Sequence, residues 1–185
     1  MVCACLGACS TVETQSFIVA KNSNVESAQI SADADFSQYD KLMSGGFGIY
    51  FPPEAAPPQE DLNRLREAFA TAFRAQLQGY TVVEEPGPGV MQVDSSLIDL
   101  RNAGAAAIPD LRRDINEIAQ SGNLVFLMEM KDSQSGHVLA RAGDSARTPA
   151  FAISPGSETD WTSVEEAAQY WAQLFRTFLD ENLGR

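Results

Sequence analysis

Two segments of the chain repeat apolar residues every three or four positions, a spacing that places them on one face of an α-helix. The first segment runs from about Gln59 to Gln78 and is followed by Gly79, a residue type that often ends helices. The second runs from about Thr162 to Asn182. We therefore expect two long amphipathic helices. Their apolar stripes are Leu62, Leu65, Phe69, Phe73 and Leu77 in the first, and Val164, Ala168, Trp171, Leu174, Phe175, Phe178 and Leu179 in the second.

Five other segments are rich in β-branched, aromatic and other apolar residues and are bounded by glycine, proline or polar residues, as strands are. The first precedes the first helix and the second follows it, which predicts a parallel pair joined by a right-handed crossover. The turn Pro86–Gly89 then predicts an antiparallel partner, and Asp132–Gly136 predicts a hairpin loop. The pattern indicates an α+β fold: a five-stranded mixed, largely antiparallel sheet with two long helices packed on one face. The predicted strands are Phe47–Phe51, Tyr80–Glu84, Val90–Leu100, Leu124–Lys131 and Val138–Arg147.

The strand Leu124–Lys131 carries apolar residues on both of its faces. A strand with one face in water would alternate apolar and polar residues, so Val125 and Leu127 on the second face need a cover. A short amphipathic helix expected at Pro109–Gln120 is one candidate, and a partner protein or a second copy of the chain is the other. Trp161 precedes the last helix at a loop end and is a further candidate for recognition. The possible interaction surface therefore comprises Val125, Leu127 and Trp161.

Length and charge limit the function classes. A chain of 185 residues with 44% hydrophobic and 21% charged residues fits one globular domain. Its net charge of −12 offers no positive field to phosphate, so we expect no nucleic-acid partner. Charge also disfavours attraction to anionic lipid headgroups, and no run of 18 apolar residues occurs that could span a bilayer.

The three cysteines all lie within the first nine residues, at Cys3, Cys5 and Cys9. A disulfide framework would spread them through the fold, and a zinc site would add His or acidic ligands. The segment Leu6–Ser10 instead resembles the lipobox of bacterial lipoproteins, in which small residues precede a cysteine that receives a diacylglyceryl group. This interpretation assigns lipidation to Cys9, with a chance cluster of thiols and small residues as the alternative.

The lipobox interpretation divides the chain into three parts. Residues 1–8 are expected to be a signal-peptide remnant, although they are too short for a full signal sequence. Residues 9–34, which are rich in Ser, Thr, Asn and Gln, are expected to form a flexible tether behind the lipidated cysteine. Residues 35–185 are expected to form the single α+β domain. The alternative for part of the tether is an edge strand at Ser16–Lys21.

Four stretches of the chain look like one known family. They are Asp35–Leu42, the Glu85–Val90 turn, the Asp132–Ala140 hairpin and the last helix with its tryptophan. Together they resemble the bacterial lipoprotein family catalogued as Domain of Unknown Function 3313, over about Asp33 to Leu183. The chain departs from the expected pattern at Ser44-Gly45-Gly46, where small residues stand in place of β-prone ones. The resemblance implies a lipoprotein signal, and it brings neither an activity nor catalytic residues.

The residues themselves predict no catalytic, cofactor-binding or metal site. His137 is the only histidine, and no Gly-x-Ser-x-Gly motif presents a nucleophile to it. The stretch from Asp33 begins like a calcium loop but lacks the required glycine and final glutamate. Carboxylate pairs occur near turns or helix starts, where solvent or the helix dipole accounts for them. These pairs are Glu84–Glu85, Asp110 with Asp114, and Glu165–Glu166.

The function expected from these observations is a non-enzymatic binding or structural role in the bacterial cell envelope. A lipid on Cys9 would attach the protein on the periplasmic side, and Ser10 after it favours the outer membrane, by the habit of such lipoproteins. The expected partner is an envelope protein or a second copy of the chain. Two alternatives stay open: an envelope hydrolase or transferase that uses carboxylates, and a carrier of a lipid-like ligand, which would show an apolar cavity between sheet and helices.

Overall fold

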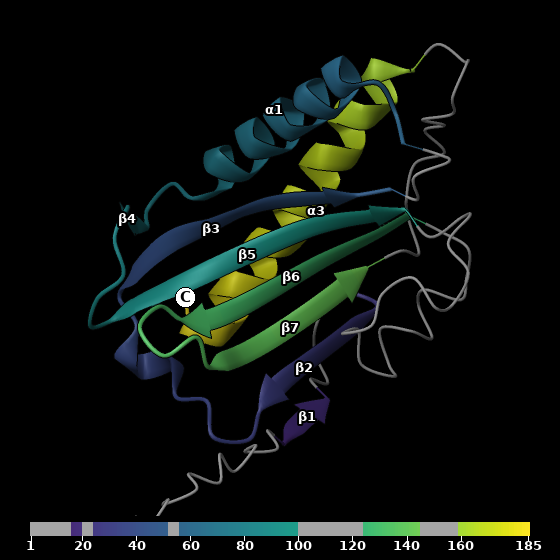
Figure 1. Ribbon diagram of the computed structural model, residues 1–185. Helices are drawn as coiled ribbons and strands as arrows, with labels where there is room; N and C mark the ends of the chain where they lie inside the picture. Colours follow the sequence, from purple (N-terminus) through teal and green to yellow (C-terminus); the bar gives the residue numbers. More distant parts are fainter. Residues whose placement is uncertain (1–15, 20–23, 52–55, 100–123, 145–158) are drawn as a thin grey trace, which may run out of the picture.

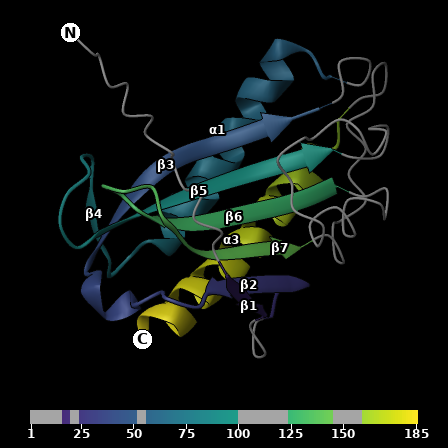
Figure 2. The same ribbon diagram turned by 60° about the horizontal axis from the view of Figure 1, so that its bottom comes forward.

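The computed structural model describes residues 16–19, 24–51, 56–99, 124–144 and 159–185. In these residues a mixed sheet carries two helices on one face (Figure 1), as the apolar stripes predict. Helix α1 spans Gln59–Gln76 and helix α3 spans Trp161–Leu183. A short 3-10 helix, η1 (Phe36–Gln38), lies beside the C-terminal part of α3 (Figure 2). The strands are β1 (Phe17–Val19), β2 (Ser27–Ser31), β3 (Lys41–Tyr50), β4 (Thr81–Val83), β5 (Val90–Asp99), β6 (Leu124–Asp132) and β7 (Val138–Asp144).

The sheet has seven strands in the described residues, in the order β1-β2-β7-β6-β5-β3-β4, so the expectation of five is wrong. The five predicted strands are present, and the two additional ones come from the polar stretch near the N-terminus. β2 pairs antiparallel with β7, and β1 pairs antiparallel with β2. β1 is a three-residue apolar strand, Phe17-Ile18-Val19, that remains half-buried or exposed, and β2 is a mostly polar strand from which the side chain of Ala28 joins the buried core. The edge strand considered at Ser16–Lys21 is confirmed for Phe17–Val19.

The parallel pairs centre on β3, which lies between β4 and β5 and runs parallel to both. The crossover through α1 therefore joins parallel strands as expected, but the turn Pro86–Gly89 does not produce an antiparallel pair. β4 is only three residues long. After β4 the chain turns back to the level at which β3 begins, and it enters β5 on the opposite side of β3 from β4. The carbonyl of Gly89 accepts hydrogen bonds from the amides of Asp40 and Lys41, which aligns the starts of β3 and β5.

β3 begins at Lys41, before the predicted start at Phe47, and it contains an irregularity between Ser44 and Gly46. Gly46 has φ of +117°, a conformation that side-chain-bearing residues rarely adopt. The extra residue is a β-bulge, and the register continues regularly from Gly46↔Asp94 to Tyr50↔Ile98. The small residues Ser44–Gly46 therefore lie within β3, where the bulge needs a glycine with positive φ.

The core fills the space between the sheet and the two helices. Trp171 of α3 is fully buried, and its ring packs against Phe69 of α1 and Phe126 of β6, with centroids 5.9 and 5.5 Å away. Its indole Nε1–H donates to the buried carboxylate of Asp144 at 3.0 Å. The stripe predicted on α3 is buried throughout, whereas on α1 only Leu65 and Phe69 are fully buried. The half-buried residues Phe73 and Leu77 of the α1 stripe border a cavity.

Candidate functional site

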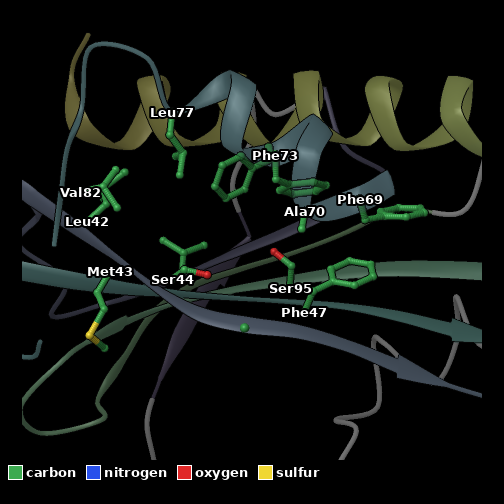
Figure 3. A pocket seen from close by; sticks show the side chains of 13 residues that line it. Leu42, Met43, Ser44, Phe47, Phe69, Ala70, Phe73, Leu77, Val82 and Ser95 are labelled. Atoms are coloured by element: carbon green, nitrogen blue, oxygen red, sulfur yellow. The ribbon is translucent and has the colours of Figure 1, made fainter. Parts of the chain in front are cut away.

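A cavity of about 250 Å³ lies between α1 and the β3–β4 edge of the sheet (Figure 3). Its roof is α1, from which Phe69, Phe73 and Leu77 extend toward the sheet. Its floor consists of β3, β4 and β5. The described residues that line it are Leu42, Met43, Ser44, Gly46, Phe47, Phe69, Ala70, Phe73, Leu77, Val82, Val93, Ser95 and Phe175.

The cavity exists because small residues occupy the floor and roof where large ones would fill it. The register places Ser44 beside Val93 and Phe47 beside Ser95, so each serine lies next to a larger lining residue on the neighbouring strand. Gly46 contributes no side chain, and Ala70 only a methyl group, on the α1 side (Figure 3). The cavity is partly open at its rim, where Ser44, Gly46 and Val82 are exposed, so its apolar interior can be reached from outside.

Aromatic rings form the inner wall of the cavity. Phe47 stacks on Phe69 with centroids 4.8 Å apart, and Phe73 packs against Phe175 at 4.9 Å. None of the described lining residues carries an ionisable side chain, and the serine hydroxyls supply most of the side-chain polarity. Such a lining has no group to act as a general acid or base. It suits an uncharged, mainly apolar group held by burial, with a hydroxyl available for one or two hydrogen bonds.

A second hollow of about 550 Å³ runs between α1 and α3 on the side away from the sheet. Trp161 lies at this hollow with the Arg64 guanidinium 4.0 Å from its ring centroid, a cation–π contact. The lining includes Glu67 and Glu165, so the hollow is more polar than the cavity under α1. Trp161 is half-buried, and it is the first residue of α3 after the N-cap Asp160, whereas the sequence pattern predicts it in the loop before the helix.

The structure does not gather the proposed interaction residues onto one surface. Val125 and Leu127 lie on the sheet face that points away from the helices, since their neighbour Phe126 contacts Trp171. Val125 is fully buried and Leu127 is half-buried, whereas Trp161 is on the helix side. The expected helix Pro109–Gln120 and the lipidation residue Cys9 lie outside the described residues.

The family described as "Protein of unknown function (DUF3313)" matches residues 20–175. This chain belongs to the DUF3313 family. The family description assigns no activity, so membership in the family does not indicate what the protein does. No curated protein matches the chain. In the described part of this DUF3313 chain, neither helix combines the length and apolarity needed to cross a membrane.

Two solved structures are distantly similar. A PelC dodecamer from Paraburkholderia phytofirmans is 14% identical, with 80% of this chain and 95% of that chain covered and a TM-score of 0.37. A PDZ domain protein from Parabacteroides distasonis is 14% identical, with 82% of this chain covered and a TM-score of 0.40. This DUF3313 chain spans 34% of the length of the latter. Neither likeness is close enough to carry an argument about function.

The carboxylates and the histidine of the DUF3313 domain take structural roles where the structure describes them. The ring of His137 contacts Asp33 through Nε2 at 3.2 Å, and the Ser31 hydroxyl, more than His137, lowers the pKa of Asp33. Glu84 and Glu85 are exposed. No group of three or more His, Cys, Asp or Glu side chains that could hold a metal ion occurs among the described residues.

A neutral charge network covers the sheet face away from the helices. The Lys131 ammonium lies 2.7 Å from Asp94 and 3.0 Å from Glu129, and Arg141 pairs with Glu129. These side chains come from the neighbouring strands β5, β6 and β7. A Cβ at Gly45 would lie 1.6 Å from Asp94 Oδ1, so only glycine fits beneath this carboxylate.

A tyrosine contact ties the end of α1 to the end of α3. The Tyr80 hydroxyl donates to Asp180 at 2.6 Å, and its ring lies near the guanidinium groups of Arg176 and Arg185. Burial, followed by the hydrogen bond to Asp180, raises the pKa of Tyr80 to about 12. The turn after α1, which bounds the Leu77 end of the cavity, is fixed by this contact.

We expect the Tyr80 contact to make stability depend on alkaline pH. Because the folded pKa of about 12 exceeds the ordinary value of 10.0, the contribution is complete below pH 10. It is lost as the pH rises through the folded pKa. Urea unfolding between pH 9 and 12 measures this loss, and Tyr80→Phe should reduce the slope above pH 10. A slope that Tyr80→Phe leaves unchanged would contradict the role assigned to this hydroxyl.

Proposed function

We propose that this DUF3313 domain is a non-enzymatic binding module of the bacterial cell envelope that holds an apolar group of another molecule in the cavity under α1. The observation that carries the proposal is the cavity itself, which is lined by Phe47, Phe69, Phe73 and other uncharged residues. Its volume of about 250 Å³ exceeds that of engineered apolar cavities of about 150 Å³ that bind benzene. An aromatic ring, a large aliphatic side chain or part of a hydrocarbon chain fits this space.

The lining also favours binding over catalysis. The described residues around the cavity include no carboxylate, histidine, cysteine or basic side chain, so a bound group would meet no ionisable side chain there. Attachment through a lipid on Cys9, with the domain on the periplasmic side of the outer membrane, is the part of the proposal that rests on the sequence. Tethering would confine the domain and its partner to one thin layer, where a small apolar contact suffices for binding.

The neutral fluorophore N-phenyl-1-naphthylamine tests the cavity, because its fluorescence rises when it enters apolar surroundings and its lack of charge avoids the acidic surface. We expect saturable binding to the purified chain. Ala70→Leu, which adds three carbons where the Ala70 methyl lines the cavity, should weaken this binding at least about tenfold, or about 1.4 kcal/mol.

Ala75→Leu is the matched control, because it makes the same substitution on the same helix at an exposed position that lines the other hollow. It should leave the affinity for the fluorophore unchanged. Thermal unfolding of each variant confirms that the fold is retained. Equal affinities for the Ala70→Leu and Ala75→Leu variants, or absence of saturable binding to the unmodified chain, would contradict the proposal.

A further inference from the structure

Within the part of the chain that the structure describes, the outer edge of β3 has no strand partner along most of its length. β4 pairs only with Lys41–Met43, and in the described residues the stretch Ser44–Tyr50 pairs on one side only, with β5. Ser44, Gly45 and Gly46 are exposed, and the side chain of Tyr50 is 59% exposed. Figure 1 shows β4 ending well before β3 does, so the edge lies beside α1 with no neighbouring labelled strand.

This open edge borders the cavity directly. Ser44, Gly46 and Phe47 belong both to the singly paired stretch and to the cavity lining. Beyond the bulge, Gly46–Tyr50 keeps a regular register with β5, and the four residues after Gly46, whose φ is +117°, continue as an extended strand. A strand edge of this kind presents a row of N–H and C=O groups that can pair with another extended chain.

We propose that an extended peptide segment of a partner protein pairs with the Gly46–Tyr50 edge of β3 and places an apolar side chain in the cavity under α1. This inference rests on the proposed function and specifies its occupant. Backbone pairing would supply affinity, and the cavity would select the side chain, as in other cases of strand addition. A hydrocarbon chain could fill the cavity but could not use the backbone groups of the edge, so the combination favours a peptide.

Two further observations indicate what kind of segment would fit the edge. β4 already occupies the first part of the same edge as a parallel strand, so the edge accepts a strand at this position on the sheet. The chain has a net charge of −12, and Glu84 and Glu85 are exposed directly after β4. A segment flanked by Lys or Arg therefore complements this edge, whereas a second copy of the chain would add another −12.

The test uses a nine-residue synthetic peptide, Lys-Thr-Val-Thr-Phe-Thr-Val-Thr-Lys, whose alternation places Val and Phe on one face of an extended strand. The control peptide has the same side chains. N-methyl groups replace the amide hydrogens that would point toward β3, so it lacks the donors needed for pairing. Binding is measured by displacement of N-phenyl-1-naphthylamine, and amide hydrogen exchange of the full chain locates it. We expect the peptide to displace the fluorophore, the N-methylated peptide to bind at least about tenfold more weakly, and exchange within Gly46–Tyr50 to slow.

The two proposals fail in different ways in this experiment. If the fluorophore binds but the peptide neither displaces it nor slows exchange in β3, strand addition is wrong while the apolar cavity stands. Equal binding of the two peptides would also overturn strand addition, because side chains alone would then account for the affinity. If the fluorophore itself fails to bind while the peptide protects Gly46–Tyr50, the edge is a docking site and the cavity proposal is wrong.

Discussion

Trp171→Ala should lower the free energy of unfolding by about 3–5 kcal/mol, the range found for large aromatic residues truncated in a core. Trp171 has no exposed surface, and its ring lies between α1 and β6, where it contacts Phe69 and Phe126. The substitution would also remove the donor that its indole offers to the buried Asp144 carboxylate. Urea unfolding followed by circular dichroism measures the change.

Trp161→Ala is the matched control, because it removes the same side chain from the half-buried start of α3. Its contact with Arg64 should contribute about 1 kcal/mol or less at such a site. Trp171→Phe separates packing from hydrogen bonding, since it keeps an aromatic ring and removes the N–H. A loss below about 1 kcal/mol for Trp171→Ala, with the fold retained, would contradict the core described here.

If the proposed lipidation holds, Cys9→Ser should move the protein from the membrane fraction to the soluble fraction when it is produced in its native host. The reason is that serine lacks the thiol that would carry the lipid, and the chain has a net charge of −12, which opposes adhesion to anionic lipid surfaces. Ultracentrifugation of lysed cells followed by immunoblotting measures the distribution. A single acyl chain binds membranes weakly, so stable attachment requires the several chains typical of bacterial lipoproteins.

Cys5→Ser provides the control for this experiment, because it removes a neighbouring thiol without changing Cys9, the proposed lipidation residue. The Cys5→Ser protein should remain with the membrane. If the Cys9→Ser protein also remains there, the anchor is not on Cys9, and the envelope part of the proposed function loses its support. The cavity and strand-edge proposals would be unaffected, since they rest on the described domain alone.

The helices and most strands of this fold were predictable from the sequence because their apolar spacing is strong. The α3 stripe from Val164 to Leu179 is buried as its period requires. β2 escaped prediction because it is short and mostly polar, and it joins the sheet through backbone pairing with β7, whereas β1, which pairs with β2, was expected only as the alternative to a flexible tether. A short polar strand such as β2 leaves little hydrophobic signal in a single sequence.

The cavity could not be predicted because it arises from residues far apart along the chain. Ser44, Ala70 and Ser95 meet only after β3, α1 and β5 have assembled, and the bulge at Gly45 sets which side chains face α1. The small residues Ser44-Gly45-Gly46 were the one visible signal, because they interrupt a strand that is otherwise apolar. Similarly, the two-faced apolar pattern around Val125 correctly indicated burial on the second face, but not what covers it.

The most direct test of the central claim is to locate a bound apolar probe by NMR. With N-phenyl-1-naphthylamine at saturation, we expect intermolecular nuclear Overhauser effects from the probe to the methyl groups of Leu42, Leu77 and Val82, which line the cavity (Figure 3). We also expect Ala70→Leu to abolish these contacts while Ala75→Leu preserves them. Contacts to Trp161 or Leu127 in place of the cavity methyl groups would contradict the binding of an apolar group under α1.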